Sequence, residues 1–200
     1  MKLVIVIPCY NEEEVLPTSS QEIGNLLKEL VSKGKVSKES KILFVDDGSA
    51  DRTWEIIESL RAQESFFTGL KFSRNFGHQA AVLAGLTVAS KDADAIISID
   101  ADLQDDLLAI EKMVDAFLEG YEVVYGVRNK RDTDSWFKRT TAVGFYKVMN
   151  LLGANVVENH ADFRLTSKRA TKAMIDLPER KLFFKRDGPL GWIQIHQCLL

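Results

Sequence analysis

The fold is indicated by the stretch Ala95-Ile96-Ile97-Ser98-Ile99-Asp100-Ala101-Asp102-Leu103-Gln104, an apolar run that ends in two carboxylates one residue apart. Its first half is β-branched and carries no charge before Asp100, which predicts a buried parallel strand. Asp100 and Asp102 then lie at the strand's carboxyl end, the edge where open α/β sheets bind ligands. Two carboxylates there suit a hard cation such as Mg²⁺ or Mn²⁺ held against phosphate oxygens. A single pair of this kind is also typical of solvated loops, so evidence from the rest of the chain is needed before a cation site is inferred.

Composition narrows the class of protein. The chain has 200 residues, of which 46% are hydrophobic, enough for one domain with a real core and too many for a disordered chain. A formal net charge of -3 argues against a general nucleic-acid binder. Cys9 and Cys198 make neither a disulfide framework nor a metal-thiolate site and fit a reducing compartment. The N-terminal apolar run is too short for a signal peptide, and none approaches the roughly 18 to 20 residues that span a bilayer.

Strands and helices alternate along the chain. Further apolar runs predict strands at 3–7, 42–45, 70–73 and 123–127. The first expected helix begins with an acidic turn at 12–14 and runs to about Lys33, and the second begins after Asp51, which caps it. Further helices are expected at 80–89, 107–118 and 134–150. We expect 162–165 to be extended or loop, and Ser167 to cap a helix. This order predicts a mostly parallel sheet with helices on both faces.

Polar residues follow three of these strands and converge on one edge of the sheet. They are Tyr10-Asn11-Glu12, Asp46-Asp47 and the pair at 100 and 102. Uncompensated carboxylates would repel one another, so a bound cation, a base or ribose, or Arg74 must balance them. The alternative is that some acids only cap helices; we prefer capping for Asp51 and ligand binding for Asp46 and Asp47.

Five ordered motifs resemble the family-2 glycosyltransferases of GT-A fold. Three of them are Ile7-Pro8-Cys9-Tyr10-Asn11-Glu12-Glu13, Val45-Asp46-Asp47-Gly48-Ser49-Ala50-Asp51-Arg52-Thr53 and Asp100-Ala101-Asp102-Leu103-Gln104-Asp105. The other two, Ser73-Arg74-Asn75-Phe76-Gly77-His78-Gln79-Ala80-Ala81 with Ala84-Gly85-Leu86 and Ala161-Asp162-Phe163-Arg164-Leu165, are similar to the polyprenyl-phosphate branch, which includes dolichol-phosphate mannose synthase and bactoprenol glucosyltransferases. The resemblance covers about residues 3–180.

The resemblance assigns roles to individual residues. It implies that the nucleotide's base and ribose are held by Pro8, Tyr10, Asn11, Glu12 and Asp47, with Asp46 and Arg74 nearby. It implies a metal held on the diphosphate by Asp100, Asp102 and Gln104, where a cation stabilises charge on the leaving group. Arg128 and Arg139 resemble the acceptor-phosphate ligands, and a solvated basic loop is the alternative. Asp162 and Arg164 orient the acceptor or the sugar, or form a structural pair.

The implied reaction is transfer of a sugar from a UDP- or GDP-sugar to polyprenyl phosphate, for cell-envelope or glycoconjugate synthesis. We expect a catalytic domain at 1–180 and an amphipathic tail at 181–200, which contacts a membrane or a partner and precedes the membrane helices usual in the branch. The protein would then work at the cytoplasmic face of a membrane, with homo-oligomers possible. The chain is either an excised catalytic domain or a soluble relative whose acceptor is not a lipid.

Other classes fit less well. A saccharide acceptor and an inactive sugar-nucleotide-binding module remain open. A phospho-receiver domain would be shorter and would leave residues 11–13 unexplained. The sequence argues against a dinucleotide oxidoreductase and a P-loop ATPase, because no G-x-G-x-x-G or Gly-Lys-Ser/Thr loop follows a strand. We expect none of the histidines to ligate a metal, and Cys9 to be a small buried residue rather than a nucleophile.

Overall fold

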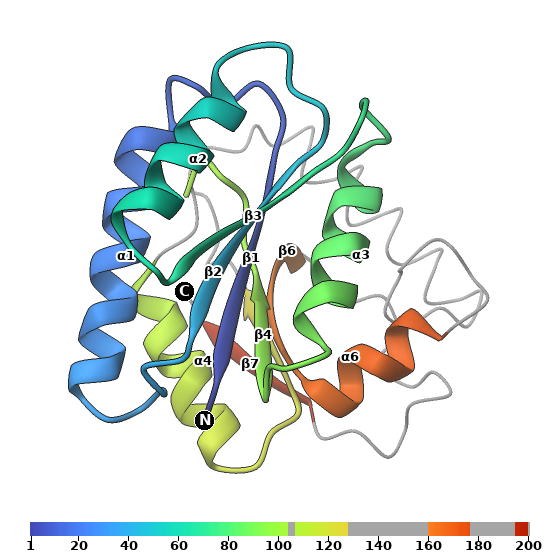
Figure 1. The fold of residues 1–200 in the computed structure, drawn as a ribbon. Coiled ribbons are helices and arrows are strands. Elements are labelled where there is room, and N and C mark those ends of the chain that lie inside the picture. The colour runs from blue at the N-terminus through green and yellow to red at the C-terminus, as the bar shows by residue number, and fades with distance from the viewer. Residues whose placement is uncertain (104–106, 128–159, 177–194, 200) are drawn as a thin grey trace, which may run out of the picture.

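A seven-stranded sheet with the order β3-β2-β1-β4-β6-β5-β7 organises the computed structural model of the chain (Figure 1). The structure describes residues 1–103, 107–127, 160–176 and 195–199. The strands are β1 Leu3–Cys9, β2 Lys41–Asp46, β3 Phe67–Lys71, β4 Ala95–Ser98, β5 Val123–Val127, β6 His160–Ser167 and β7 Ile195–Leu199. The helices are α1 Leu16–Ser32, α2 Thr53–Gln63, α3 His78–Ala89, α4 Leu108–Leu118 and α6 Lys168–Ile175.

The sheet is mostly parallel, as the alternation of strands and helices predicts. β1 pairs in parallel with both β2 and β4, and β2 pairs in parallel with β3. β6 is antiparallel to both of its neighbours, β4 and β5, and the segment predicted to be extended or loop at 162–165 lies within it. The carboxyl ends of β1, β2 and β4 therefore meet at one edge, which is the arrangement that the candidate site requires.

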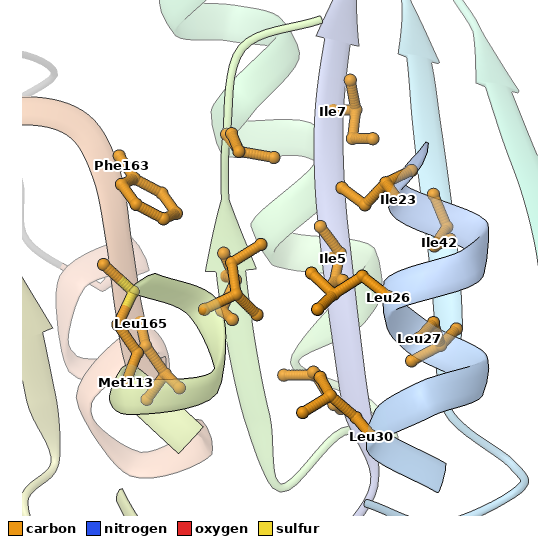
Figure 2. Packing of buried hydrophobic residues seen from close by; sticks show 14 of the residues in the cluster. Ile5, Ile7, Ile23, Leu26, Leu27, Leu30, Ile42, Met113, Phe163 and Leu165 are labelled. Atoms are coloured by element: carbon orange, nitrogen blue, oxygen red, sulfur yellow. The ribbon is translucent and has the colours of Figure 1, made fainter. Parts of the chain in front are cut away.

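Helices cover both faces of the sheet (Figure 1). α1, α2 and α4 pack on one face, and α3 and α6 pack on the other. Figure 2 shows the first face, where isoleucines of β1 and β2 meet apolar side chains of α1, and where Met113 of α4 lies beside Phe163 and Leu165 of β6. Each such side chain contributes roughly 1.5–3 kcal/mol when fully buried, so this core holds the strand ends in place.

Helix α3 lies especially close to the sheet, as its small residues predict. A Cβ added at Gly85 would lie 2.3 Å from Cγ1 of Val6 and 3.0 Å from Cγ2 of Val45. The helix begins at His78, two residues before the predicted start. This close packing fixes the first turn of α3 relative to β1 and β2.

Helix α1 begins later than predicted, and the prediction of an acidic first turn is wrong. The helix starts at Leu16, and the backbone N–H groups of Val15 and Leu16 both donate to the carbonyl of Glu12, 3.2 and 2.9 Å away. Residues 12–14 therefore form a turn before the helix. Gly34, with φ +71°, follows the last turn as the sequence predicts.

Several smaller expectations differ from the structure. β3 begins at Phe67, earlier than predicted, because the chain pairs with β2 from Ile42 onward. The helix predicted at 107–118 is α4, and Leu118 in its final turn is 54% exposed. Ser167 caps α6 as predicted, because its hydroxyl accepts the N–H of Ala170 at 2.9 Å.

The C-terminal part of the chain was predicted as an amphipathic tail at 181–200. Within it, residues Ile195–Leu199 form β7, which pairs in parallel with β5 at the edge of the sheet. No strand was predicted there. The helix predicted at 134–150 lies outside the described residues. None of the helices in the described ranges is long and apolar enough to cross a membrane.

Candidate functional site

A cleft of about 290 Å³ opens at the carboxyl edge of β1, β2 and β4. Residues from all three predicted strand ends line it, together with residues from the loop after β3 and the first turns of α3. The lining residues are Pro8, Cys9, Tyr10, Glu12, Asp47, Asn75, His78, Ala81, Asp100, Ala101 and Asp102. The convergence predicted from the strand ends is thereby confirmed.

Negative charge accumulates in this cleft. Burial raises the pKa of the Glu12 carboxyl, and the negative charges of Asp102 and Asp100 raise it further. Three carboxylates from two different strand ends therefore influence one another across the cleft. Such a group favours a ligand that brings positive charge or hydrogen-bond donors.

The loop that carries Asp100 and Asp102 has an unusual backbone. Leu103 has φ +47°, a left-handed conformation that costs a non-glycine residue on the order of 1–3 kcal/mol, and its N–H donates to the carbonyl of Asp100 at 3.3 Å. Such strain is common at functional sites. Here it turns the chain immediately after the two carboxylates.

The donor set of this loop is compatible with a hard divalent cation. Mg²⁺ is usually held by one or two carboxylates together with phosphate oxygens of the substrate. Asp100 and Asp102 supply that pair of carboxylates, and the predicted third ligand, Gln104, lies outside the described residues. In the described parts of the chain, no group of three or more His, Cys, Asp or Glu side chains could hold a metal by itself.

Asp47 holds the loop that follows β3. Its Oδ1 accepts the backbone N–H of Phe76 at 2.7 Å, and its Oδ2 accepts that of Gly77 at 2.8 Å. The side chain is 2% exposed, so these bonds are shielded from water. Asp47 thus lines the cleft, as predicted for a nucleotide-binding residue, and it also fixes the start of α3.

Gly48 allows the same loop to pass close to β2. Its φ is +70°, and an added Cβ would lie 2.3 Å from the backbone carbonyl carbon of Arg74 and 2.7 Å from the N of Asn75. No side chain fits there without moving the loop. The sequence Asp47-Gly48 therefore acts as a clamp on residues 74–77.

Asn11 and Asp46 support the cleft without lining it. Asn11 has φ +54°, its N–H donates to Oγ of Ser49, and its Oδ1 accepts the N–H of Ala50, both at 2.9 Å. Asp46 is fully buried, and its Oδ1 accepts the N–H of Ser49 at 3.0 Å. These contacts hold the turn at 48–50, and the nucleotide-binding roles predicted for both residues stay predictions.

Two further predictions concern residues beside this turn. Asp51 was predicted to cap α2, and its Oδ1 accepts the N–H of Thr53, the first residue of that helix, at 3.0 Å. Its Oδ2 accepts the N–H of Glu13 at 3.1 Å, which ties the first two strand ends together. Arg74 was expected to balance the acids, but its guanidinium lies 4.1 Å from the centre of the Phe76 ring, and Arg74 is not among the lining residues.

Arg164 is a buried residue of β6. It is 4% exposed and is in register with Ser98 of β4 and Tyr125 of β5. Burial raises the pKa of Tyr125 to about 12, and the positive charge of Arg164 acts in the opposite direction, which indicates that the two side chains are close. Arg164 is not among the residues that line the cleft.

Three other predicted site residues lie wholly or partly beyond what is described. Arg128 and Arg139 lie outside the described ranges, and of Asp162 only the backbone, in β6, is described. Their roles stay predictions.

Sequence reasoning missed His78 and Asn75, which both line the cleft. Nε2 of His78 lies 3.8 Å from Oδ1 of Asp100. The available signal was their position inside the motif at 73–81. Cys9 also lines the cleft, but it is buried, and burial together with the charges of Glu12 and Asp46 raises the pKa of its thiol. A thiol that stays protonated is a poor nucleophile, as predicted for Cys9.

Comparison with known proteins agrees with this geometry. The model of a family described as glycosyl transferase family 2 matches residues 4–175. The chain is 48% identical over 188 residues to the uncharacterized glycosyltransferase YkoT of Bacillus subtilis, covering 94% of this chain and 56% of that protein. It is 39% identical over 194 residues to the bactoprenol glucosyl transferase of Shigella phage SfV, covering 96% of this chain and 60% of that protein. The chain therefore spans a little more than half the length of these relatives.

A solved structure shows the same fold. Glucosyl-3-phosphoglycerate synthase from Mycobacterium tuberculosis, in complex with Mn²⁺, UDP-glucose and phosphoglyceric acid, is similar with a TM-score of 0.64 at 20% identity. The similarity covers 99% of this chain and 69% of that chain. The predicted GT-A fold is confirmed.

Proposed function

The chain belongs to glycosyl transferase family 2, and from this premise we propose that it transfers a sugar from a UDP- or GDP-sugar to a polyprenyl phosphate with the help of Mg²⁺ or Mn²⁺. One observation carries the proposal. Glu12, Asp100 and Asp102 line a single cleft at the carboxyl edge of a parallel sheet, where their mutual repulsion calls for a cationic or hydrogen-bonding ligand.

The lining residues divide into two groups by their chemistry. Pro8, Tyr10, Glu12 and Asp47 surround the part of the cleft next to β1 and β2 and would hold the base and ribose. Tyr10 is 47% exposed and offers a ring face against which a base can stack. Asp100 and Asp102 would hold the cation together with the diphosphate, with Gln104 as the proposed third ligand.

The reaction itself requires one bond to break and one to form. The bond between the anomeric carbon and the diphosphate oxygen breaks, and its electron pair leaves with the nucleoside diphosphate. An oxygen of the acceptor phosphate forms the new bond to the anomeric carbon. A bound divalent cation supplies positive charge against the departing diphosphate. Since a phosphate monoester is already ionised at neutral pH, no residue of the chain has to remove a proton from it.

The acceptor assignment is supported by the 39% identity to a protein named bactoprenol glucosyl transferase. Within this proposal Arg128 and Arg139 bind the acceptor phosphate, because a guanidinium fork matches phosphate geometry. Asp162 orients the acceptor or the sugar, and Arg164, which is buried and does not line the cleft, forms a structural pair with it. The natural setting of such an acceptor is the cytoplasmic face of a membrane.

The proposal is tested first by calorimetric titration. UDP-glucose, UDP and GDP-mannose are titrated into the folded chain with Mn²⁺ and again with EDTA. We expect one nucleotide family to bind, and to bind more weakly in EDTA. Absence of binding by all three in a demonstrably folded protein would refute the donor assignment.

A second experiment tests the acceptor. Transfer of radiolabelled sugar is measured from the preferred donor to polyprenyl phosphate in detergent and to a panel of saccharides. Transfer only to the lipid supports the proposal. Transfer only to a saccharide identifies the alternative acceptor, and donor binding with no transfer to any acceptor indicates a binding module.

A further inference from the structure

We propose that His78 contacts the diphosphate of the donor, by donating an imidazole N–H to a phosphate oxygen, and that Asp47 positions it to do so. The inference rests on the proposed function and deepens it. It assigns a role to a side chain for which the sequence analysis predicted none.

The position of His78 is the first argument. It is the first residue of α3 and lines the cleft on the side facing the loop after β4. Its Nε2 lies 3.8 Å from Oδ1 of Asp100, and the two side chains are 44% and 47% exposed. The imidazole therefore stands beside the carboxylate of Asp100 at the lining of the cleft.

The composition of the cleft is the second argument. A diphosphate is an anion, and the residues described as lining the cleft include neither lysine nor arginine. Among those lining residues, His78 is the one side chain that can carry positive charge, and Asn75 supplies the other nitrogen donor. Against three carboxylates, an anionic ligand needs every donor that the cleft offers, and a hydrogen bond to a charged group is stronger than one between neutral groups.

The third argument is that the chain holds His78 in place through contacts distant in sequence. Asp47 accepts two backbone N–H bonds from the residues just before His78, at 2.7 and 2.8 Å. Gly77, with φ +97°, then turns the chain into α3. Gly85, about two turns further along the helix, seats α3 against Val6. A side chain held at both ends of its segment is prearranged for a ligand.

The test compares UDP, which has a β-phosphate, with UMP, which lacks it. Affinities of both for the full chain are measured by calorimetry with Mn²⁺, for the unsubstituted chain, His78→Ala, His78→Gln and the control Gln79→Ala. Gln79 is the exposed neighbour of His78 on α3 and does not line the cleft. If the unsubstituted chain prefers guanine nucleotides, GDP and GMP replace this pair.

We expect His78→Ala to weaken UDP binding about tenfold to a hundredfold, while UMP binding stays within about twofold. His78→Gln, which keeps an N–H donor, should recover part of the affinity for UDP, and Gln79→Ala should bind both nucleotides normally. Binding of Mn²⁺ alone should be the same for His78→Ala as for the unsubstituted chain.

Three results would overturn the inference while leaving the proposed function intact. They are unchanged UDP affinity in His78→Ala, an equal loss for UDP and UMP, which would indicate a structural role, and a weaker affinity for Mn²⁺ alone, which would assign His78 to the cation. If the unsubstituted chain binds no nucleotide, the proposed function itself fails.

Discussion

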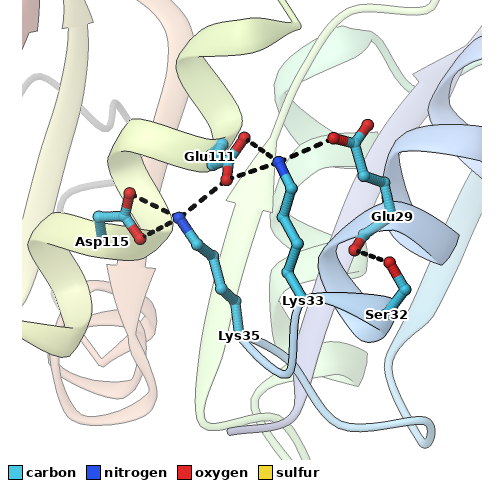
Figure 3. Close-up of polar contacts among 6 residues, drawn as sticks. All are labelled: Glu29, Ser32, Lys33, Lys35, Glu111 and Asp115. Carbon is cyan, nitrogen blue, oxygen red and sulfur yellow. Dashed lines mark hydrogen bonds and ion pairs between the residues drawn. The ribbon is translucent and has the colours of Figure 1, made fainter.

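Acidic side chains have opposite surroundings near the two ends of helix α1. At its start lies the cleft, where Glu12 faces Asp100 and Asp102. After its last turn, Lys33 and Lys35 contact acids of α1 and α4 in an extended ion-pair network (Figure 3). Nζ of Lys33 lies 2.7 Å from a carboxylate oxygen of Glu29 and 2.9 Å from one of Glu111. Nζ of Lys35 lies 2.8 Å from Glu111 and 2.6 Å from Asp115.

The pKa shifts of the acids follow this difference. In the network, hydrogen bonds from Lys35 and Lys33 lower the pKa of Glu111. In the cleft, burial and the neighbouring acids raise the pKa of Glu12. The same residue type therefore helps to hold the fold together at one end of the helix and opposes folding at the other. A carboxyl whose pKa the fold raises in a cleft is a candidate for ligand binding.

The largest expected effect is on catalysis. In Asp102→Asn we expect turnover to fall at least about a hundredfold with the fold intact, because one charge-stabilising group typically lowers a barrier by a few kcal/mol. The matched control is Asp115→Asn, the same change in the network, which should leave turnover unchanged. Sugar release from the donor and thermal unfolding are measured for both. Near-normal turnover in a folded Asp102→Asn protein would contradict the metal assignment.

The next largest effect is on stability, and it is measured by comparing two glycines with similar backbone conformations. Gly34 near the network has φ +71° and nothing within 4 Å of an added Cβ, whereas Gly48 at the cleft has φ +70° and the Arg74 backbone at 2.3 Å. Gly34→Ala should cost about 1 kcal/mol, or roughly 2–4 °C in Tm. Gly48→Ala should cost about 1–3 kcal/mol more, since the 74–77 loop must move, and should weaken UDP binding. Equal losses of Tm would show that the clamp is unimportant.

A smaller effect concerns the charge of Glu12. Because the fold raises the pKa of this carboxyl, the folded state binds its proton more readily than the unfolded state, so stability is lost as pH rises through the raised pKa. Without metal or nucleotide, Glu12→Gln should therefore raise Tm at pH 7, by up to about 3 °C, and the gain should shrink as pH falls toward about 4. Calorimetric melting at several pH values measures this. A lower Tm at pH 7 would refute it.

The smallest effect is at the network. Because the fold lowers the pKa of Glu111, its carboxylate contributes to folding stability at pH values above the ordinary carboxyl pKa. That contribution is lost as pH falls through the lowered pKa. Glu111→Gln should lower Tm at pH 7 by no more than about 2 °C, because exposed ion pairs contribute little. The difference should diminish in 1 M salt. A loss that persists at high salt would mean that Glu111 acts through packing instead.

Local pattern was enough for much of the fold. The apolar runs at 3–7, 42–45 and 95–99 formed strands that pair in parallel through β1, and acids that follow them line a cleft at one edge. The predictions that failed concern segments whose structure depends on contacts with residues distant in the sequence. Residues 12–14 have the composition of a helical first turn, yet Thr53 and Asp51 accept the backbone N–H groups of Glu12 and Glu13 and hold them outside the helix. The edge strand at 195–199 could form only after β5 offered a partner.

For the site, the sequence by itself determined which residue types stand at the strand ends, because strand periodicity and the positions of acids are local properties of the chain. The tertiary structure decided which of them line the cleft. Asp47 bonds to residues 29 and 30 positions later in the chain, and that contact brings His78 opposite Asp100. Asn11 and Asp46, equally acidic or polar in sequence, turn to the loop at 48–50 instead. The direction of a side chain depends on which backbone donors the folded chain brings within about 3 Å, and no local pattern contains that information.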